Sequence, residues 1–255
     1  MNNEEIRLKY KSERDGKIFT TNFGTDFIIK DYRNNDNILI EFLDEHKYNK
    51  VVQWTNITKG AIKNPFDKIC FGVACMGYDG NVKNKEAYKT WHALLQRTVD
   101  PKYKEKHTAY KDTKICNEWL IYDNFEKWYE SNYYNIGEKL YIDKDIIRKN
   151  NKTYSPDNCV FVPRIINNLF TTRRLNRGKY PIGVNKKDTD NKFCAKCNEF
   201  GNAIIIGYYN TEKEAFEAYK TEKEKYIKQV ADLYKDKIPK VLYNALYNYK
   251  VEITD

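Results

Sequence analysis

The chain has 255 residues, of which 41% are hydrophobic and 15% aromatic, and its formal net charge at pH 7 is +9. This composition excludes a disordered or collagen-like chain, because it holds enough apolar side chains to build cores. The positive charge favours a polyanionic partner, most commonly nucleic acid, although a lysine-rich composition without functional meaning also accounts for it.

No stretch reaches the roughly 18–20 apolar residues that a membrane-spanning helix needs. The chain starts with the polar run Met1-Asn2-Asn3-Glu4-Glu5 and not with the apolar core of a signal peptide. We therefore expect a cytoplasmic protein with no membrane partner. In that compartment its six cysteines stay reduced.

Residues 1–80 are predicted to form a small β-rich domain. Three short runs rich in strand-forming residues, at 26–30, 38–42 and 51–54, are separated by polar turn residues. Short strands at this spacing, with no helix-length pattern between them, indicate a small antiparallel barrel or a curled sheet. The sequence leaves open whether this domain binds a partner or only packs.

Residues 81–172 begin with two helix patterns. In the first, apolar residues recur at intervals of three and four: Ala87, Trp91, Leu94, Leu95 and Thr98. The second takes its apolar side from Trp119, Leu120, Phe125 and Trp128. Aromatic residues at helical spacing are more often core residues than stacking platforms for bases, so a core role is expected.

The most informative stretch lies at residues 140–168. An apolar strand ends at Asp143 and Asp145, and a polar loop returns through Ser155-Pro156-Asp157-Asn158 to a second strand and a helix. This order can bring a carboxylate and an amide to one point, where oxygen ligands suit a hard divalent cation. Loops with Asp and Asn are common, so the pattern alone is weak evidence.

Residues 173–255 are predicted to form three strands and one long helix. The strand-like runs are 182–186, 192–198 and 203–208, and the helix begins at a capping box, Thr211-Glu212-Lys213-Glu214. The buried stripe of this helix is expected to consist of Phe216, Tyr219, Tyr226, Ile227, Val230, Ala231 and Tyr234.

The three segments together predict an α+β protein with several domains. These are a small β-barrel-like domain at 1–80, a ββα segment with flanking helices at 81–172, and a three-stranded antiparallel sheet with a helix at 173–255.

Basic residues concentrate at the start of the last segment and in its sheet. Alternation along the middle strand predicts that Phe193, Ala195 and Cys197 face the helix, and that the opposite face carries Lys192, Cys194, Lys196 and Asn198. Lysine suits phosphate or guanine, and asparagine suits adenine. The residues expected to contact DNA are Arg173, Arg174, Arg177, Lys186, Lys187, Lys192, Lys196 and Asn198. A solvated run of charge is the alternative interpretation.

Cys194 and Cys197 have the spacing of zinc ligands. Four ligands need a second pair nearby, and the sequence holds no second Cys-x-x-Cys and no matching histidine pair. Cys197 is therefore interpreted as a core residue, and zinc is the less favoured cofactor.

Asp143, together with Asn158 and Asn167 at a spacing of nine residues, resembles the ββα metal finger of phage-type HNH endonucleases. The runs at 91–97 and 115–120 are similar to the upstream part of the same family. The resemblance implies that Asp143 and Asn167 bind Mg²⁺ or Mn²⁺, which stabilises charge on the scissile phosphate. It also implies that Asn158 braces the loop.

The family's general-base histidine corresponds to Lys144 in this sequence. A lysine is protonated near pH 7 unless it is strongly desolvated, so it is a poor base. Three readings stay open: binding without cleavage, a base supplied by His92 or His107, or substitution by Lys144 or Asp145. A finger that binds no metal and acts as a scaffold is a further alternative.

The segment 180–235 resembles the three-strand-plus-helix domain of plant ethylene-response factors, the Apetala class, which phage HNH proteins often carry. The matching residues are Gly183-Val184, Phe193-Cys194-Ala195, Ile206-Gly207-Tyr208-Tyr209 and the helix start at 211–219. The resemblance implies a sheet that lies in the major groove of double-stranded DNA. That family reads bases mostly with Arg and Trp, which this sheet lacks, so strong sequence specificity is not expected.

These features predict a phage DNA-binding protein, in the cytoplasm of a bacterial host, that cleaves or nicks DNA with a metal ion. The alternative is a catalytically inactive protein that binds nucleic acid or a host nucleoprotein complex, as a regulator or an inhibitor of host defence. Lys144 favours the alternative, whereas the set Asp143, Asn158 and Asn167 favours cleavage.

Overall fold

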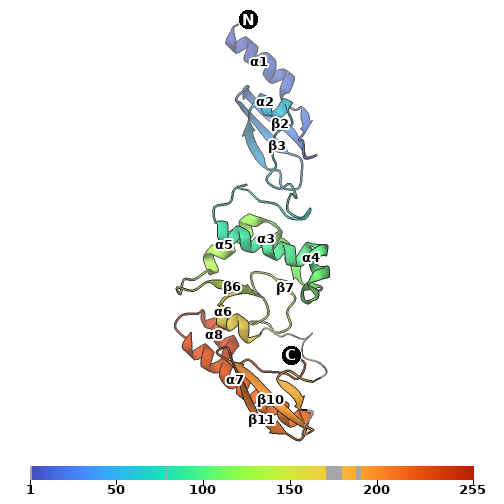
Figure 1. Cartoon of the computed structure of the whole chain (residues 1–255). Helices are drawn as coiled ribbons and strands as arrows, with labels where there is room; N and C mark the ends of the chain where they lie inside the picture. Colours follow the sequence, from blue (N-terminus) through green and yellow to red (C-terminus); the bar gives the residue numbers. More distant parts are fainter. Residues whose placement is uncertain (1, 79, 171–179, 188–190) are drawn as a thin grey trace. The chain divides into compact units, whose positions relative to one another are not determined.

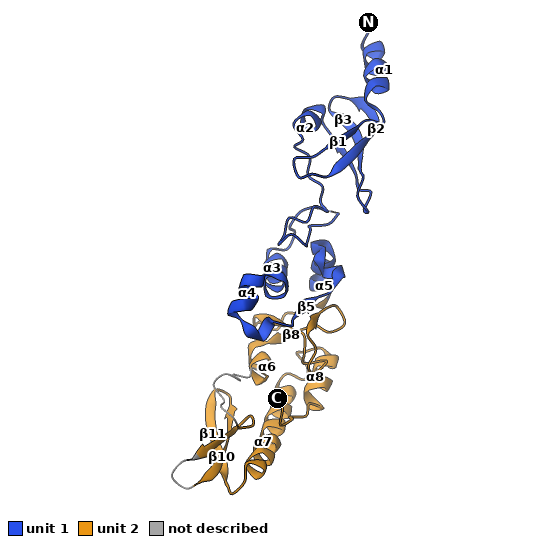
Figure 2. Cartoon of the chain, turned by 90° about the vertical axis from the view of Figure 1, so that its right-hand side faces the viewer, with its two compact units in different colours: residues 1–131 blue, residues 132–255 orange. Residues whose placement is uncertain are grey.

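The computed structural model describes residues 2–78, 80–170, 180–187 and 191–255. They form two compact units, residues 1–131 and 132–255 (Figure 2). Both units combine helices with sheets, which confirms the predicted mixed α+β class (Figure 1). The division between the units falls inside the segment 81–172, and the finer domain boundaries stay predictions. Within the described ranges, no helix is both long enough and apolar enough to span a membrane.

Unit 1 begins with an antiparallel sheet of four strands in the order β1-β2-β3-β4. They are β1 Ile18–Thr20, β2 Asp26–Asn34, β3 Asn37–Phe42 and β4 Asn49–Val52. Alternate residues of β3 are buried, as a strand with one face on a core requires. The expected barrel is wrong, because each outer strand pairs with only one described neighbour and the sheet stays open. With three and four residues, β1 and β4 are too short to close it.

A helix that the sequence analysis did not predict, α1 (Asn3–Arg14), precedes this sheet and buries none of its residues. Lys11 pairs with Asp31 of β2. The guanidinium of Arg14 lies 3.6 Å from the ring centroid of Trp54, the first residue of α2 (Trp54–Thr58). A cation over an aromatic face contributes about 0.5–2 kcal/mol. Polar and cation–π contacts, together with Tyr10 packed on the core of the sheet, therefore hold α1.

The remainder of unit 1 is mainly helical. Its elements are α3 Lys85–Val99, α4 Pro101–Lys106, η1 Thr108–Tyr110, β5 Lys114–Ile115, η2 Asn117–Leu120 and α5 Tyr122–Asn132. The five residues that α3 buries are the five predicted from its periodicity. Trp91 and Trp119 are fully buried, and Trp91 Nε1 donates to the backbone oxygen of Trp119 at 2.6 Å. Their predicted core role is confirmed.

Unit 2 opens with the ββα segment, residues 140–169. It consists of β6 Leu140–Asp143, β7 Thr153–Tyr154 in the connecting loop, β8 Val160–Pro163 and α6 Arg164–Leu169. β6 and β8 are antiparallel, with Asp143 opposite Val160. All four residues of β8 are buried, so this strand anchors the segment in the core. The order of strand, loop, strand and helix agrees with the sequence prediction.

The rest of unit 2 is a three-stranded antiparallel sheet and two helices. The sheet order is β11-β10-β9, with β9 Val184–Lys187, β10 Lys192–Glu199 and β11 Asn202–Tyr209. The helices are α7 Glu212–Leu233 and α8 Lys240–Tyr247. The capping box predicted at Thr211 forms, and α7 buries every residue of the predicted stripe except its C-cap, Tyr234.

The ββα segment and the C-terminal sheet share one hydrophobic core. Its buried members come from the segment, the sheet and both helices, and include Ile146, Val162, Ile166, Val184, Ala195, Phe216, Ile227 and Leu242. Burying one such side chain contributes about 1.5–3 kcal/mol. The ββα segment is therefore packed as an integral part of unit 2.

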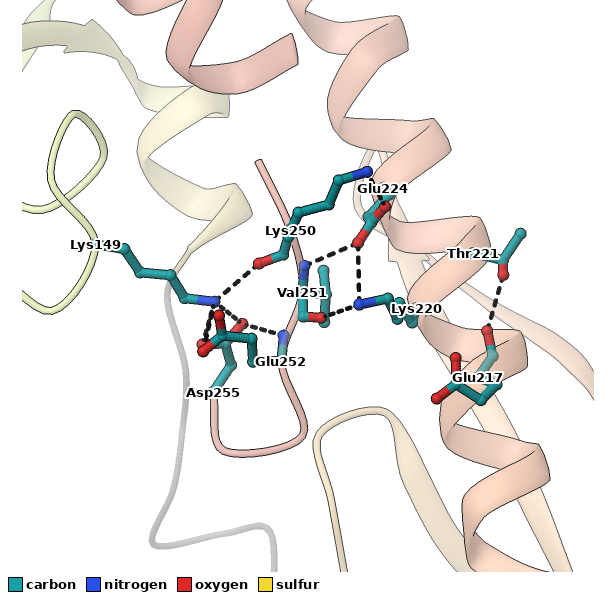
Figure 3. A network of polar contacts seen from close by, with 9 residues as sticks. All are labelled: Lys149, Glu217, Lys220, Thr221, Glu224, Lys250, Val251, Glu252 and Asp255. Atoms are coloured by element: carbon teal, nitrogen blue, oxygen red, sulfur yellow. Dashed lines mark hydrogen bonds and ion pairs between the residues drawn. The ribbon is translucent and has the colours of Figure 1, made fainter. Parts of the chain in front are cut away.

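A polar network ties the end of the chain to the loop after β6 and to α7 (Figure 3). Lys149 of that loop donates to the Lys250 backbone oxygen at 2.8 Å and lies 2.8 Å from Asp255 Oδ1. On α7, Glu224 accepts the backbone N–H of Val251 at 3.0 Å. The loop that follows Asp143 is thereby held against the body of unit 2.

Gly183 stands where the chain enters β9 against α7. Its φ is +77°, and an added Cβ would lie 2.1 Å from the Tyr219 ring. We expect Gly183→Ala to lower the unfolding free energy of unit 2 by about 2 kcal/mol or more, through the positive φ and the clash. Chemical denaturation followed by far-UV circular dichroism measures this loss. Gly201→Ala is the control: its φ is +88° with nothing within 4 Å, so only the conformational cost applies.

Candidate functional site

The carboxylate of Asp143 anchors the loop that follows β6. Its Oδ1 accepts the backbone N–H of Asp145 at 2.9 Å and that of Ile146 at 2.8 Å. A short polar side chain often caps the turn of the chain that follows it in this way. The residue predicted as a metal ligand thus also has a structural role, which the strand ending in Asp-x-Asp could have indicated.

Burial raises the pKa of Asp143 to about 6, and the neighbouring carboxylate of Asp145 adds to the effect. The two backbone N–H donors act in the opposite direction, because they stabilise the charged form. The unfavourable free energy of removing this carboxylate from water is therefore larger than the stabilisation from the two hydrogen bonds. Asp143 is therefore a charge held at some cost to stability.

Lys144, predicted to stand where HNH endonucleases carry their general base, is engaged with a carboxylate. Its Nζ lies 2.9 Å from Asp145 Oδ2, its side chain is 13% exposed, and the ammonium lies 5.7 Å from the Tyr154 ring centroid. An ammonium has three N–H donors and no acceptor, so it cannot take a proton from an attacking water. In this geometry Lys144 and Asp145 form an ion pair and Lys144 is not presented as a base, while Asp145 as the base stays a prediction.

Asn151, which the sequence analysis did not single out, organises the same loop. Its Nδ2 donates to the backbone oxygens of Lys144 at 2.7 Å and Thr153 at 2.8 Å, and its Oδ1 accepts from Asn158 Nδ2 at 3.3 Å. The bracing role expected of Asn158 therefore operates through a second amide. Asn158 Oδ1 is buried, with no hydrogen-bond partner among the described residues.

The ββα segment offers oxygen donors to a metal ion. Asp143, Asn158 and Asn167 all lie in it, and Asn167 is on α6, which packs on β6 and β8. Carboxylate and amide oxygens suit Mg²⁺ or Mn²⁺. Two observations argue against a metal ion here. One Asp143 oxygen already accepts hydrogen bonds from two backbone N–H groups. The described residues also hold no group of three or more His, Cys, Asp or Glu that could bind a metal.

The two histidines considered as alternative bases belong to unit 1. His92 lies on α3 with its ring 4.9 Å from Phe71, and the His107 ring is 4.2 Å from that of Tyr103. Both rings are in aromatic contacts within their own unit. Their use as bases stays a prediction.

The second candidate site is the face of the β9–β11 sheet that points away from α7, here called the outer face. Ala195 and Cys197 are buried against α7 and Phe193 packs on the same core, so the predicted inner face is confirmed. Cross-strand pairing places the following described residues on the outer face: Asn185, Lys192, Cys194, Lys196, Asn198, Ala203, Ile205 and Tyr208. All of them are exposed to solvent except the half-buried Cys194.

The predicted DNA contacts do not all lie on this face. Lys192, Lys196 and Asn198 do, whereas Lys186 pairs with Phe193 and its Nζ lies 6.0 Å from that ring's centroid, which places it on the α7 side. Strand alternation thus separates Lys186 from Lys192, and Lys186 as a DNA contact stays a prediction. Lys187 pairs with Lys192 in the backbone register. Arg173, Arg174 and Arg177 lie outside the described residues.

The two cysteines with zinc-ligand spacing lie on opposite faces of β10. Cys197 is 2% exposed in the shared core, while Cys194 is on the outer face, opposite Tyr208. A spacing of three residues along a strand reverses the side-chain direction. These thiols cannot ligate one ion together.

The chain matches no protein-family model, no curated protein and no solved structure. The two sites are therefore distinguished by their own geometry. The outer face presents exposed cations and amides on a rigid sheet. The ββα segment presents a buried carboxylate beside the Lys144–Asp145 ion pair.

Proposed function

We propose that this chain binds double-stranded DNA through the outer face of the β9–β11 sheet. The proposal is based on a group of exposed cationic and amide side chains on a face that α7 does not cover. They are Lys192, Lys196, Asn185 and Asn198. The opposite face is fixed in the core, so the strands cannot bend away from a partner without losing that packing. A rigid, basic and amide-bearing surface suits a polyanion with readable base edges.

The dimensions of the sheet fit the major groove. Three strands about 4.8 Å apart span roughly 10 Å, and the groove of B-DNA is about 12 Å wide. The major groove of A-form RNA is narrow and deep, so it does not admit a sheet. Duplex DNA is therefore the nucleic acid that the surface fits best. The basic residues at 171–179 and Lys187 stay proposed as additional phosphate contacts.

The test is a titration of a fluorescent DNA duplex by anisotropy at salt concentrations between about 50 and about 200 mM. Each phosphate contact contributes about −0.9 to the slope of log K against log salt, so Lys192 and Lys196 alone predict a slope near −2 or steeper. An affinity that does not change with salt, or no binding at the lowest salt, contradicts the proposal.

Metal-dependent cleavage or nicking of DNA is a second candidate function. It is supported by a buried carboxylate, Asp143, beside Asp145 and by the orphaned Asn158 oxygen, since a divalent cation would neutralise this negative charge. Lys144, held in an ion pair with Asp145, argues against it, because an ammonium cannot act as the base. Nicking of supercoiled plasmid with Mg²⁺ or Mn²⁺, abolished by EDTA and by Asp143→Ala, would establish cleavage. DNA binding without any nicking would instead support the alternative function, that of a catalytically inactive regulator that acts on DNA or on a host nucleoprotein complex.

A further inference from the structure

The outer face combines amides with apolar side chains and carries no arginine in its described strands. We infer that it prefers A·T-rich duplexes to G·C-rich ones. The inference rests on the proposed function and specifies its substrate. It follows from the positions of the amide, apolar and cationic side chains on the three strands.

The amides occupy two separate rows of the outer face. Asn185 of β9 pairs with Cys194, and Asn198 of β10 pairs with Ala203, so the two amides lie at different positions along the sheet. An asparagine amide can donate through Nδ2 to adenine N7 and accept through Oδ1 from the N6 amino group, a bidentate contact that is specific for adenine in the major groove. Their short side chains lie next to small partners, which leaves the amides accessible.

The apolar side chains lie on the strand beside them. A bulge in the β10–β11 pairing makes Ile206 an extra residue, and its side chain packs on the core while Ile205 stays outside. Ile205 is 55% exposed opposite Lys196, and Tyr208 is 48% exposed opposite Cys194. Without the bulge, regular alternation of side chains would reverse the faces on which Ile205 and Ile206 lie.

An apolar side chain in the major groove contacts the thymine 5-methyl group, which no other standard base pair presents. Guanine is read by arginine or lysine, and arginine does so with two parallel N–H groups. The cations whose side chains are described on this face, Lys192 and Lys196, are point charges without that fork. The surface therefore has partners for adenine and thymine and lacks the arginine fork for guanine.

Exposed isoleucine and tyrosine also occur at protein interfaces. The following experiment distinguishes a DNA interface from a protein interface. Duplexes of one length compete for the full chain in the anisotropy assay: A·T-rich, G·C-rich, and A·T-rich with deoxyuridine in place of thymidine. The last duplex keeps charge, pairing and helix form and removes only the methyl groups. We expect the A·T-rich duplex to bind roughly 5-fold or more tightly than the G·C-rich one. Loss of methyl groups should weaken binding about 3- to 4-fold for each methyl contacted.

Variants assign the effect to named residues. Ile205→Ala should remove the penalty for deoxyuridine, and Asn198→Ala should reduce the preference for A·T over G·C. Matched controls are Val241→Ala and Asn244→Ala, which alter exposed residues of α8 and should leave both ratios unchanged. Circular dichroism melting checks that each variant is folded.

The outcomes separate the inference from the proposed function. Equal affinity for all three duplexes, with the expected salt dependence, overturns the A·T preference and leaves DNA binding in place. A G·C preference also overturns it. Absence of binding to any duplex overturns both.

Discussion

Replacing Lys192 and Lys196 together by alanine is expected to weaken binding of duplex DNA on the order of 10- to 100-fold at about 100 mM salt. Both side chains are exposed on the outer face, where an ammonium can displace the counterions of a phosphate. The slope of log K against log salt should become shallower by about 2, one for each contact removed. Anisotropy titrations at several salt concentrations measure both quantities.

The matched control is Lys213→Ala with Lys240→Ala, two exposed lysines at the starts of α7 and α8. This variant changes the net charge by the same amount away from the outer face, so its slope should stay close to that of the unmodified chain. Equal losses in the two double variants would mean that net charge alone drives binding. That result would contradict a dedicated interface.

The second large effect is expected from Asp143→Asn, which should stabilise unit 2 at pH 7. The pKa of Asp143 in the folded chain is about 6, above its ordinary value of 3.8. Such a carboxyl binds more protons in the folded than in the unfolded state between these values, so stability falls as pH rises from about 4 to about 6. Two pKa units correspond to on the order of 3 kcal/mol at most. The amide oxygen of asparagine can still accept both backbone N–H groups.

Amide hydrogen exchange of peptides that cover β6 and β8 measures this difference within unit 2. The protection gained by Asp143→Asn should be largest at pH 7 and should vanish near pH 4, where the wild-type carboxyl is itself protonated. Asp157→Asn, at an exposed carboxylate of the same loop, is the control and should show no such pH dependence. A variant that is less stable than wild type at pH 7 would show that the charge of Asp143 stabilises the loop.

The same pair of proteins tests the proposed metal site. If Asp143 binds Mn²⁺ or Mg²⁺, the cation should increase the protection of β6 and β8 in the wild type at pH 7, by mass action. It should have no such effect on Asp143→Asn. An ion-independent wild type would leave Asp143 as a loop anchor whose charge costs stability.

Much of the fold follows from local sequence patterns. The stripe of α3, the capping box at Thr211 and the alternation along β10 were all predictable, because each rests on a period of 3.6 or 2 and on residues close in sequence. The same capping rule applied to Asn2 and Glu5 would have predicted α1, whose box is present. The contacts that hold α1, such as Arg14 on Trp54, join residues far apart in sequence and leave no period.

The details of the sites depended on features that periodicity does not encode. The bulge at Ile206 decides which isoleucine reaches the outer face, and it arises from packing against the core. Asn151 braces the loop through backbone oxygens that converge only after folding. The burial of Asp143, which raises its pKa, likewise follows from the core shared with the C-terminal sheet.

Cys194 lies on the outer face and is therefore a natural probe of its proposed contact with DNA. Its thiol is half-buried beside the exposed Tyr208, while Cys70 and Cys116 are comparably accessible in the other unit. Alkylation of each cysteine by iodoacetamide, followed by mass spectrometry with and without saturating duplex, gives three rates from one sample. We expect DNA to slow alkylation of Cys194 several-fold more than that of Cys70 and Cys116. An unchanged rate at Cys194 while DNA is bound would contradict it.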